Sequence, residues 1–149
     1  MKVLVNEHDF NAGVELAALG SADAQVGGVA CFVGRVRDRN EGGAILGLYL
    51  EHYPAMTTKA INDIVQDAAR KWSVLDATVI HRVGWLKPLD QIVFVGVASS
   101  HRGDAFSACE YIMDFLKTRA PFWKKESTPE GERWVAARAS DDAAAARWT

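Results

Sequence analysis

The sequence has few cysteines, no long apolar run and no excess of basic charge. Its two cysteines, Cys31 and Cys109, have no metal-ligand spacing and have apolar neighbours, which predicts buried, reduced thiols. No stretch approaches the roughly 18 consecutive apolar residues of a membrane-spanning helix. The N-terminus also turns polar too early for a signal peptide. We therefore expect a cytoplasmic protein that does not enter a membrane.

The common signatures of catalysis and nucleic-acid binding are missing as well. The formal net charge is -2 at pH 7, whereas a generic nucleic-acid binder is strongly basic. There is no Gly-x-Ser-x-Gly elbow, no phosphate-binding loop ending in Gly-Lys-Ser/Thr and no Gly-x-Gly-x-x-Gly fingerprint. The four histidines are scattered without zinc-ligand spacing, so we expect no metal site.

Composition and hydrophobic periodicity predict one α+β domain over residues 1–149, with a largely antiparallel sheet and packed helices. Strands are expected at 2–6, 26–34, 44–53, 77–86, 91–99, 122–127 and 133–137. Helices are expected after the caps Asn11 and Asp104 and from Pro54, where proline suits the first turn. Pro121 is expected to end the helix after Asp104. The tail from Ser140 to Thr149 is predicted to be frayed or a short helix.

Segment 35–43 (RVRDRNEGG) is predicted to be a charged, mobile loop. The strands on either side of it, 26–34 and 44–53, would then form a hairpin around the loop. The segment also holds a cluster of cations, Arg35, Arg37 and Arg39. Charged loops are usually only solvated, so this cluster alone indicates little.

A second cationic pair, His101-Arg102, falls where a central strand ends and a helix begins. Backbone N–H groups and the helix dipole favour an anion at such a place, and a guanidinium can donate two parallel hydrogen bonds to that anion. A solvated loop pair is an equal alternative. The same dipeptide recurs as His81-Arg82 inside a predicted strand, where a structural role is favoured.

A third cluster contains Lys117, Arg119, Lys124 and Lys125. Lys117 lies four residues after Met113, which continues the buried side of the helix. The simpler interpretation is that the positive charges of Lys117 and Arg119 offset the negative C-terminal end of the helix, and composition alone favours it. Strand alternation then sends Lys124 to one face and Lys125 to the other. Lys124 could form an ordinary exposed ion pair with Glu126.

Together the three clusters indicate a small, highly anionic ligand. A long polyanion is not indicated, because each cluster is short and the chain is net acidic.

Six segments between about residues 26 and 138 form a recognisable combination. They are FVGRVR (32–37), LEHYPAM (50–56), HRVG (81–84), VGVASSHR (95–102), MDFLKTRAPFWKKE (113–126) and GERW (131–134). In this order they resemble the large-subunit family of molybdopterin synthase, and residues 116–126 are specific enough to be recognised alone. Arg35 and Lys125 stand where the family accepts either lysine or arginine.

The resemblance implies an α/β hammerhead fold and a homodimeric core. Each large subunit would bind a small ubiquitin-like sulfur-carrier subunit, giving a heterotetramer. The carrier's C-terminal Gly-Gly, activated as a thiocarboxylate, would donate sulfur twice to cyclic pyranopterin monophosphate and so form the molybdopterin dithiolene. No cofactor is implied, because the carrier supplies the sulfur, and neither cysteine is needed as a relay.

The resemblance also implies which residues form the site. Lys117 would be the central catalytic residue, with Lys124 beside it. The implied substrate-binding residues are Phe32, Arg35, Val36, Arg37, His101, Arg102, Met113, Lys125, Glu126 and Arg138. Bringing an anionic phosphate and an anionic thiocarboxylate together requires fixed positive charge. A partly desolvated lysine crowded by cations has a lowered pKa, which suits acid–base work.

Two other functions fit parts of the sequence. One is a non-catalytic module that binds a ubiquitin-like carrier tail, although the intact lysine motif argues against it. The other is a small nucleotide- or RNA-binding domain using Arg35, Arg37, Lys124 and Lys125, which the acidic net charge disfavours. Whether one pocket combines residues of two protomers stays open, and His101 and Lys117 could be so divided.

Overall fold

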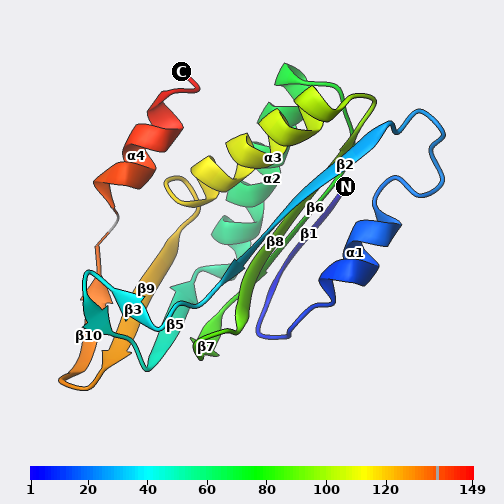
Figure 1. Ribbon diagram of the computed structural model, residues 1–149. Coiled ribbons are helices and arrows are strands. Elements are labelled where there is room, and N and C mark those ends of the chain that lie inside the picture. Colours follow the sequence, from blue (N-terminus) through cyan, green and yellow to red (C-terminus); the bar gives the residue numbers. More distant parts are fainter. Residues whose placement is uncertain (137) are drawn as a thin grey trace.

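The computed structural model describes residues 1–136 and 138–149. In chain order its elements are β1 (Lys2–Asn6), α1 (Ala12–Ala18), β2 (Gly28–Arg35), β3 (Arg39–Asn40), β4 (Gly43–Ala44), β5 (Gly47–His52), α2 (Pro54–Lys71), β6 (Val74–Arg82), β7 (Gly84–Leu86), β8 (Gln91–Ser99), α3 (Arg102–Leu116), β9 (Phe122–Thr128), β10 (Gly131–Val135) and α4 (Ala139–Ala146) (Figure 1). Within the described residues no helix is long and apolar enough to cross a membrane.

The strands form two four-stranded sheets and a small ribbon. The first sheet has the order β1-β6-β8-β2, the second has the order β10-β9-β5-β7, and β3 pairs with β4. Only β1 and β6 run parallel among the described pairs. The predicted α+β class with mainly antiparallel pairing is therefore confirmed.

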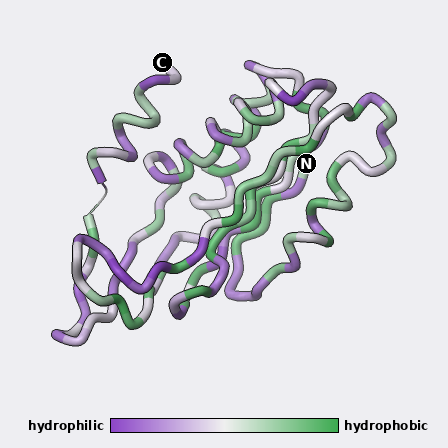
Figure 2. Tube along the Cα trace, viewed as in Figure 1, coloured by the Kyte–Doolittle hydropathy of each residue, from purple (hydrophilic) through white to green (hydrophobic). Residues whose placement is uncertain are grey.

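The main core lies between the first sheet and two helices. Helices α2 and α3 cover one face of this sheet, and the short helix α1 lies on the other face (Figure 1). Strand β8 is apolar on both faces because both are covered, and Figure 2 shows the hydrophobic band that runs along this sheet. Fully buried side chains such as Ile64, Val95 and Ile112 each contribute about 1.5–3 kcal/mol.

A smaller core joins the two sheets. Val36, Leu48, Leu50, Val83 and Leu86 are buried together, with Ile92 and Phe122 packed against them. This cluster fixes the second sheet against the end of the first sheet, and the cavities described below open beside it.

The predicted strand 77–86 is wrong, because it is two strands in two sheets. Strand β6 ends at Arg82, and β7 begins at Gly84 and pairs with β5. Gly84 has a φ of +84°, a conformation that glycine adopts without a Cβ penalty. This break redirects the chain from the first sheet into the second.

The predicted hairpin of strands 26–34 and 44–53 is also wrong. Strand β2 pairs with β8, whereas β5, which begins only at Gly47, pairs with β7 and β9. The segment between them is a short hairpin of its own, β3 and β4, instead of an open loop. Its two turn residues, Glu41 and Gly42, both have positive φ, as a tight two-residue turn requires.

Asn11 caps α1 as predicted, since its side-chain oxygen accepts a hydrogen bond from the Val14 N–H. The predicted cap Asp104 is wrong: His101 is the N-cap of α3, and the Asp104 carboxylate accepts from the Ser73 N–H at 3.1 Å. Helix α3 ends at Leu116, before the predicted stop at Pro121.

The C-terminal tail takes the short-helix alternative, as α4, and it is docked. Trp148 packs edge-on against Trp72 and Tyr111, and its indole N–H donates to Asp114 at 2.7 Å. The hairpin of β9 and β10 is confirmed, with Ala137 of the predicted strand 133–137 lying outside the described residues.

The two cysteines differ in their surroundings. Both are free thiols, and Cys109 is buried as predicted. Cys31 is exposed, so its predicted burial is wrong, because β2 is an edge strand of the first sheet.

Candidate functional site

Three adjoining cavities open where the two sheets meet the C-terminal end of α3. Their volumes are about 150, 140 and 280 Å³. Lys117 and Ile92 line all three, and Lys124 and Arg138 line the two smaller ones. Residues predicted from four separate segments of the sequence therefore meet in one place.

The two lysines reach this place from different elements. Lys117 is the C-cap of α3, and its backbone N–H bonds to the Met113 carbonyl. Lys124 is half-buried on β9, between Leu50 of β5 and Val135 of β10. Burial lowers the pKa of Lys124, and the cations Lys117 and Arg138 lower it further.

The expectation that burial and cationic neighbours lower the pKa of a lysine is met at Lys124. Asp141, which lines both smaller cavities, and Glu126 act against this shift in pKa without reversing it.

Arginines supply the remaining positive charge. Arg35 and Arg37, at and just beyond the end of β2, line the 150 and 280 Å³ cavities with Lys117. Arg138, just before α4, lines the two smaller cavities with both lysines. A wall of this kind can hold a phosphate or a carboxylate by charge and by guanidinium hydrogen bonds.

The 280 Å³ cavity also has an apolar side. Phe32 and Met113 line it beside Lys117, and the Phe32 ring is 46% exposed. Val36 differs, because it is buried in the smaller core and lines the 150 Å³ cavity instead. A flat heterocycle could lie against the Phe32 and Met113 side while its anionic group faces the cations.

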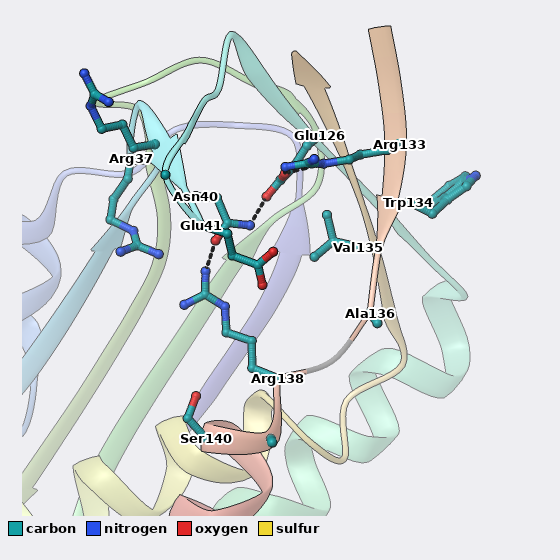
Figure 3. Close-up of a pocket in the computed structure, with 13 residues that line it drawn as sticks. Arg37, Asn40, Glu41, Glu126, Arg133, Trp134, Val135, Ala136, Arg138 and Ser140 are labelled. Carbon is teal, nitrogen blue, oxygen red and sulfur yellow. Dashed lines mark hydrogen bonds and ion pairs between the residues drawn. The ribbon is translucent and has the colours of Figure 1, made fainter. Parts of the chain in front are cut away.

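A larger cavity of about 770 Å³ adjoins these three. It shares Arg37, Arg39, Asn40, Glu126 and Arg138 with the 150 Å³ cavity that contains the lysines. Its other walls are β10 and the start of α4 (Figure 3). The chain therefore offers a wide approach to the lysines.

A hydrogen-bonded network holds the wall of this approach. Arg138 donates to the Asn40 side-chain oxygen, and Asn40 donates to Glu126 (Figure 3). The buried Glu126 carboxylate also accepts from two guanidinium nitrogens of Arg133, at 3.1 and 3.2 Å. Glu126 thus pairs with Arg133, and the exposed Lys124–Glu126 pair considered from the sequence is not formed. A buried carboxylate needs such partners, and these tie β3, β9, β10 and α4 together.

Three expected site residues lie elsewhere in the chain. His101 and Arg102 are exposed at the opposite end of α3, about 20 Å from Lys117 for a helix of 15 residues. Lys125 points to the other face of the second sheet. Its Nζ lies 5.1–5.7 Å from the ring centroids of Tyr49, Trp85 and Trp134, and 3.2 Å from Glu132.

Sequence reasoning missed other residues at the cavities. Asp141 was assigned to a tail, and its approach to Lys124 depends on the docking of α4. His81 was interpreted as structural, yet it lines two of the cavities with Lys117. The membership of His81 in the segment HRVG was the one signal that could have found it.

Comparison with known proteins shows the family to which the chain belongs. The family model described as MoaE protein matches residues 5–119. The molybdopterin synthase catalytic subunit of Ralstonia nicotianae is 57% identical over 146 residues, which cover 98% of this chain and 83% of the relative.

Solved structures share the fold. The molybdopterin biosynthesis MoaE protein from Burkholderia ambifaria superposes with a TM-score of 0.84 at 53% identity, covering 99% of this chain and 97% of that one. A protein–protein complex of subunits 1 and 2 of molybdopterin-converting factor from Helicobacter pylori gives a TM-score of 0.73 at 19% identity, covering 91% of each chain, which shows likeness of fold alone. The chain belongs to the MoaE family, the family of molybdopterin synthase catalytic subunits.

Proposed function

We propose that this chain, as the catalytic subunit of a molybdopterin synthase, transfers sulfur from a thiocarboxylated carrier subunit to cyclic pyranopterin monophosphate and so makes the dithiolene. The observation that carries the proposal is that Lys117 and Lys124 lie together with four arginines in adjoining cavities, in a chain of this family. The four arginines are Arg35, Arg37, Arg39 and Arg138.

The charge of the cavities suits this reaction. The precursor carries a cyclic phosphate and the sulfur donor is a thiocarboxylate, so the two reactants repel each other. Fixed cations lower that repulsion most effectively where water is partly excluded, as at Lys124. Lys117 and Lys124 would stabilise negative charge at the attacked carbon and on the phosphate leaving group, or transfer protons. Phe32 and Met113 would support the pterin.

The carrier tail would arrive through the 770 Å³ cavity. This cavity is continuous with the lysine site through Arg37, Arg39 and Arg138, whose positive charge complements a C-terminal thiocarboxylate. A Gly-Gly terminus has no side chains to obstruct the narrower inner cavity. The Helicobacter pylori complex of two subunits supports a partner of this kind.

A second copy of the chain would complete the site. Strand β2 is the edge of the first sheet, with α3 packed along it. Arg102 lies near Gly28 at the start of β2, whereas Arg35 and the lysine cavities lie at its end. Antiparallel pairing of two β2 strands about a two-fold axis exchanges these ends, so the His101-Arg102 pair of one copy would face Lys117 of the other. This homodimer would be the core of a heterotetramer with two carriers.

The proposal also places the reaction in the cytoplasm, and the two free thiols fit a reducing compartment.

The test mixes the purified chain with thiocarboxylated carrier and cyclic pyranopterin monophosphate, and follows the dithiolene product by mass spectrometry. We expect product with the unaltered chain and none above background with Lys117→Ala. A stable complex with the carrier that yields no product would contradict sulfur transfer and support a binding module.

A further inference from the structure

His81 is a buried histidine in the wall of the lysine cavities. It lies near the end of β6, between β1 and β8, and only 9% of its surface is exposed. Its ring stacks on Phe122 of β9, with centroids 4.0 Å apart and an interplanar angle of 19°. It lines the 140 and 280 Å³ cavities, and Lys117 lines both. The ring is therefore fixed in place next to the residue expected to be central to catalysis.

One hydrogen bond sets the tautomer of this ring. The Nδ1 atom of His81 lies 2.8 Å from the carbonyl oxygen of Arg82. A carbonyl oxygen can only accept, so the proton of the neutral ring is on Nδ1 and Nε2 carries a lone pair. Among the described residues, no side chain or backbone N–H donates to this Nε2.

The surroundings keep the ring neutral. Burial lowers the pKa of His81 to about 4, and the Lys117 cation contributes to the shift, while the bond to the Arg82 carbonyl opposes it. The titratable and charged groups that face His81 or share its cavities are Lys117, His52, Lys124, Arg35, Arg37, Arg138 and Asp141. Nearly all of them are cationic or can become so, which disfavours a further positive charge on the imidazole.

We propose that Nε2 of His81 accepts a hydrogen bond from the Lys117 ammonium and thereby positions Lys117 for sulfur transfer. This inference rests on the proposed function. A lysine side chain is flexible, so an acceptor is needed to hold its ammonium in one place. A carboxylate could do this, but it would cancel the positive charge that two anionic reactants require. A neutral imidazole holds the ammonium and leaves its charge intact.

In this arrangement His81 is a positioning residue whose own orientation is fixed by two contacts. The stack on Phe122 sets the plane of the ring, and the bond to the Arg82 carbonyl sets its tautomer. Nε2 is then the ring nitrogen that can accept a hydrogen bond from a group in the cavity.

Three variants separate the Nε2 acceptor from the other contacts. His81→Gln places a side-chain oxygen near the position of Nε2. His81→Asn reaches only the position of Nδ1, and His81→Phe keeps the aromatic stack without either nitrogen. The kcat and KM for the precursor are measured at saturating thiocarboxylated carrier. The thermal unfolding midpoint and the Kd for the carrier are measured for each variant.

We expect His81→Gln to keep kcat within about three-fold of the unaltered chain, and His81→Asn and His81→Phe to lose kcat by about 10²-fold, the effect of a misplaced catalytic group. The Kd for the carrier should not change. Full kcat in folded His81→Phe would overturn the inference, and so would equal losses in all three variants, since that pattern indicates packing alone. An unaltered chain that makes no product would instead refute the proposed function.

Discussion

At the scale of single residues, two adjacent lysines have different surroundings although they are chemically identical. Lys124 is half-buried and lines two cavities with Lys117 and Arg138, whereas Lys125 lies among three aromatic rings on the other face of the sheet. Strand alternation predicted this division from the sequence. It could not predict which face would carry the cavity, because that depends on α3 and α4.

The lysine pair gives a matched test. Lys124→Ala should lower kcat by about 10²-fold, the typical loss when one charge-stabilising group is removed. Lys125→Ala should keep kcat within about three-fold, because its side chain does not line the cavities. Both are measured by dithiolene formation at saturating carrier. Equal losses would show that the face on which the lysine lies does not decide its role.

His81 also makes stability depend on pH. Its pKa is about 4 in the folded chain and about 6.5 when unfolded, so the unfolded chain binds more protons between these values. Folding stability should therefore fall as the pH falls from 6.5 towards 4, by up to about 3 kcal/mol from this group.

Urea unfolding of the unaltered chain and of His81→Phe at several pH values would measure this effect. The difference between their free energies of unfolding should change over that interval and stay constant above pH 7. A constant difference throughout would contradict the lowered pKa.

At the scale of elements, hydrophobic periodicity predicted most strands and helices. It failed where local backbone geometry breaks or turns the chain. Segment 77–86 was predicted as one strand, but it divides between two sheets at Gly84, which has a positive φ. The segment RVRDRNEGG has the composition of a loop, yet its Glu41-Gly42 turn closes a hairpin. Hydrophobic periodicity does not report a positive φ at a single residue, so the pattern could not predict these turns.

Helix α4 supports the site although the predicted catalytic lysines lie on other elements. It follows Arg138 directly, contains Asp141 in its first turn, and is docked through Trp148. The sequence left a frayed tail and a short helix open, because this segment is rich in alanine and has few large apolar residues of its own.

Removing that anchor should weaken the site. Trp148→Ala should lower the free energy of unfolding by about 2 kcal/mol, less than the 3–5 kcal/mol typical of a fully buried tryptophan, because Trp148 is only half-buried. The KM for the precursor should rise, since Arg138 and Asp141 lose their support. Denaturant unfolding and steady-state kinetics measure the two effects. An unchanged KM would mean that Arg138 is held by Asn40 alone.

At the scale of the whole molecule, the segments of the sequence predicted the family, and several of the cations that they contain lie together at the cavities. The arrangement of copies was left open. Within one chain, Lys117 and the His101-Arg102 pair lie at opposite ends of α3. A site that uses both therefore requires two chains.

Mixed dimers test this arrangement. Lys117→Ala and Arg102→Ala chains, each inactive alone, should regain about a quarter of full activity when unfolded together and refolded as a mixture. Half of the dimers are then mixed, and each mixed dimer has one intact site. Size-exclusion chromatography checks that dimers form. Absence of recovery in dimers would show that each site lies within one chain.

The central claim is that the lysine cavities of this chain transfer sulfur from a carrier thiocarboxylate to the pterin precursor. The most direct measurement is a stoichiometric reaction in which mass spectrometry follows both the carrier C-terminus and the dithiolene. We expect two carrier thiocarboxylates to be converted to carboxylates for each dithiolene formed, and neither change with Lys117→Ala. Loss of thiocarboxylate without dithiolene, or an undiminished yield with Lys117→Ala, would contradict the account.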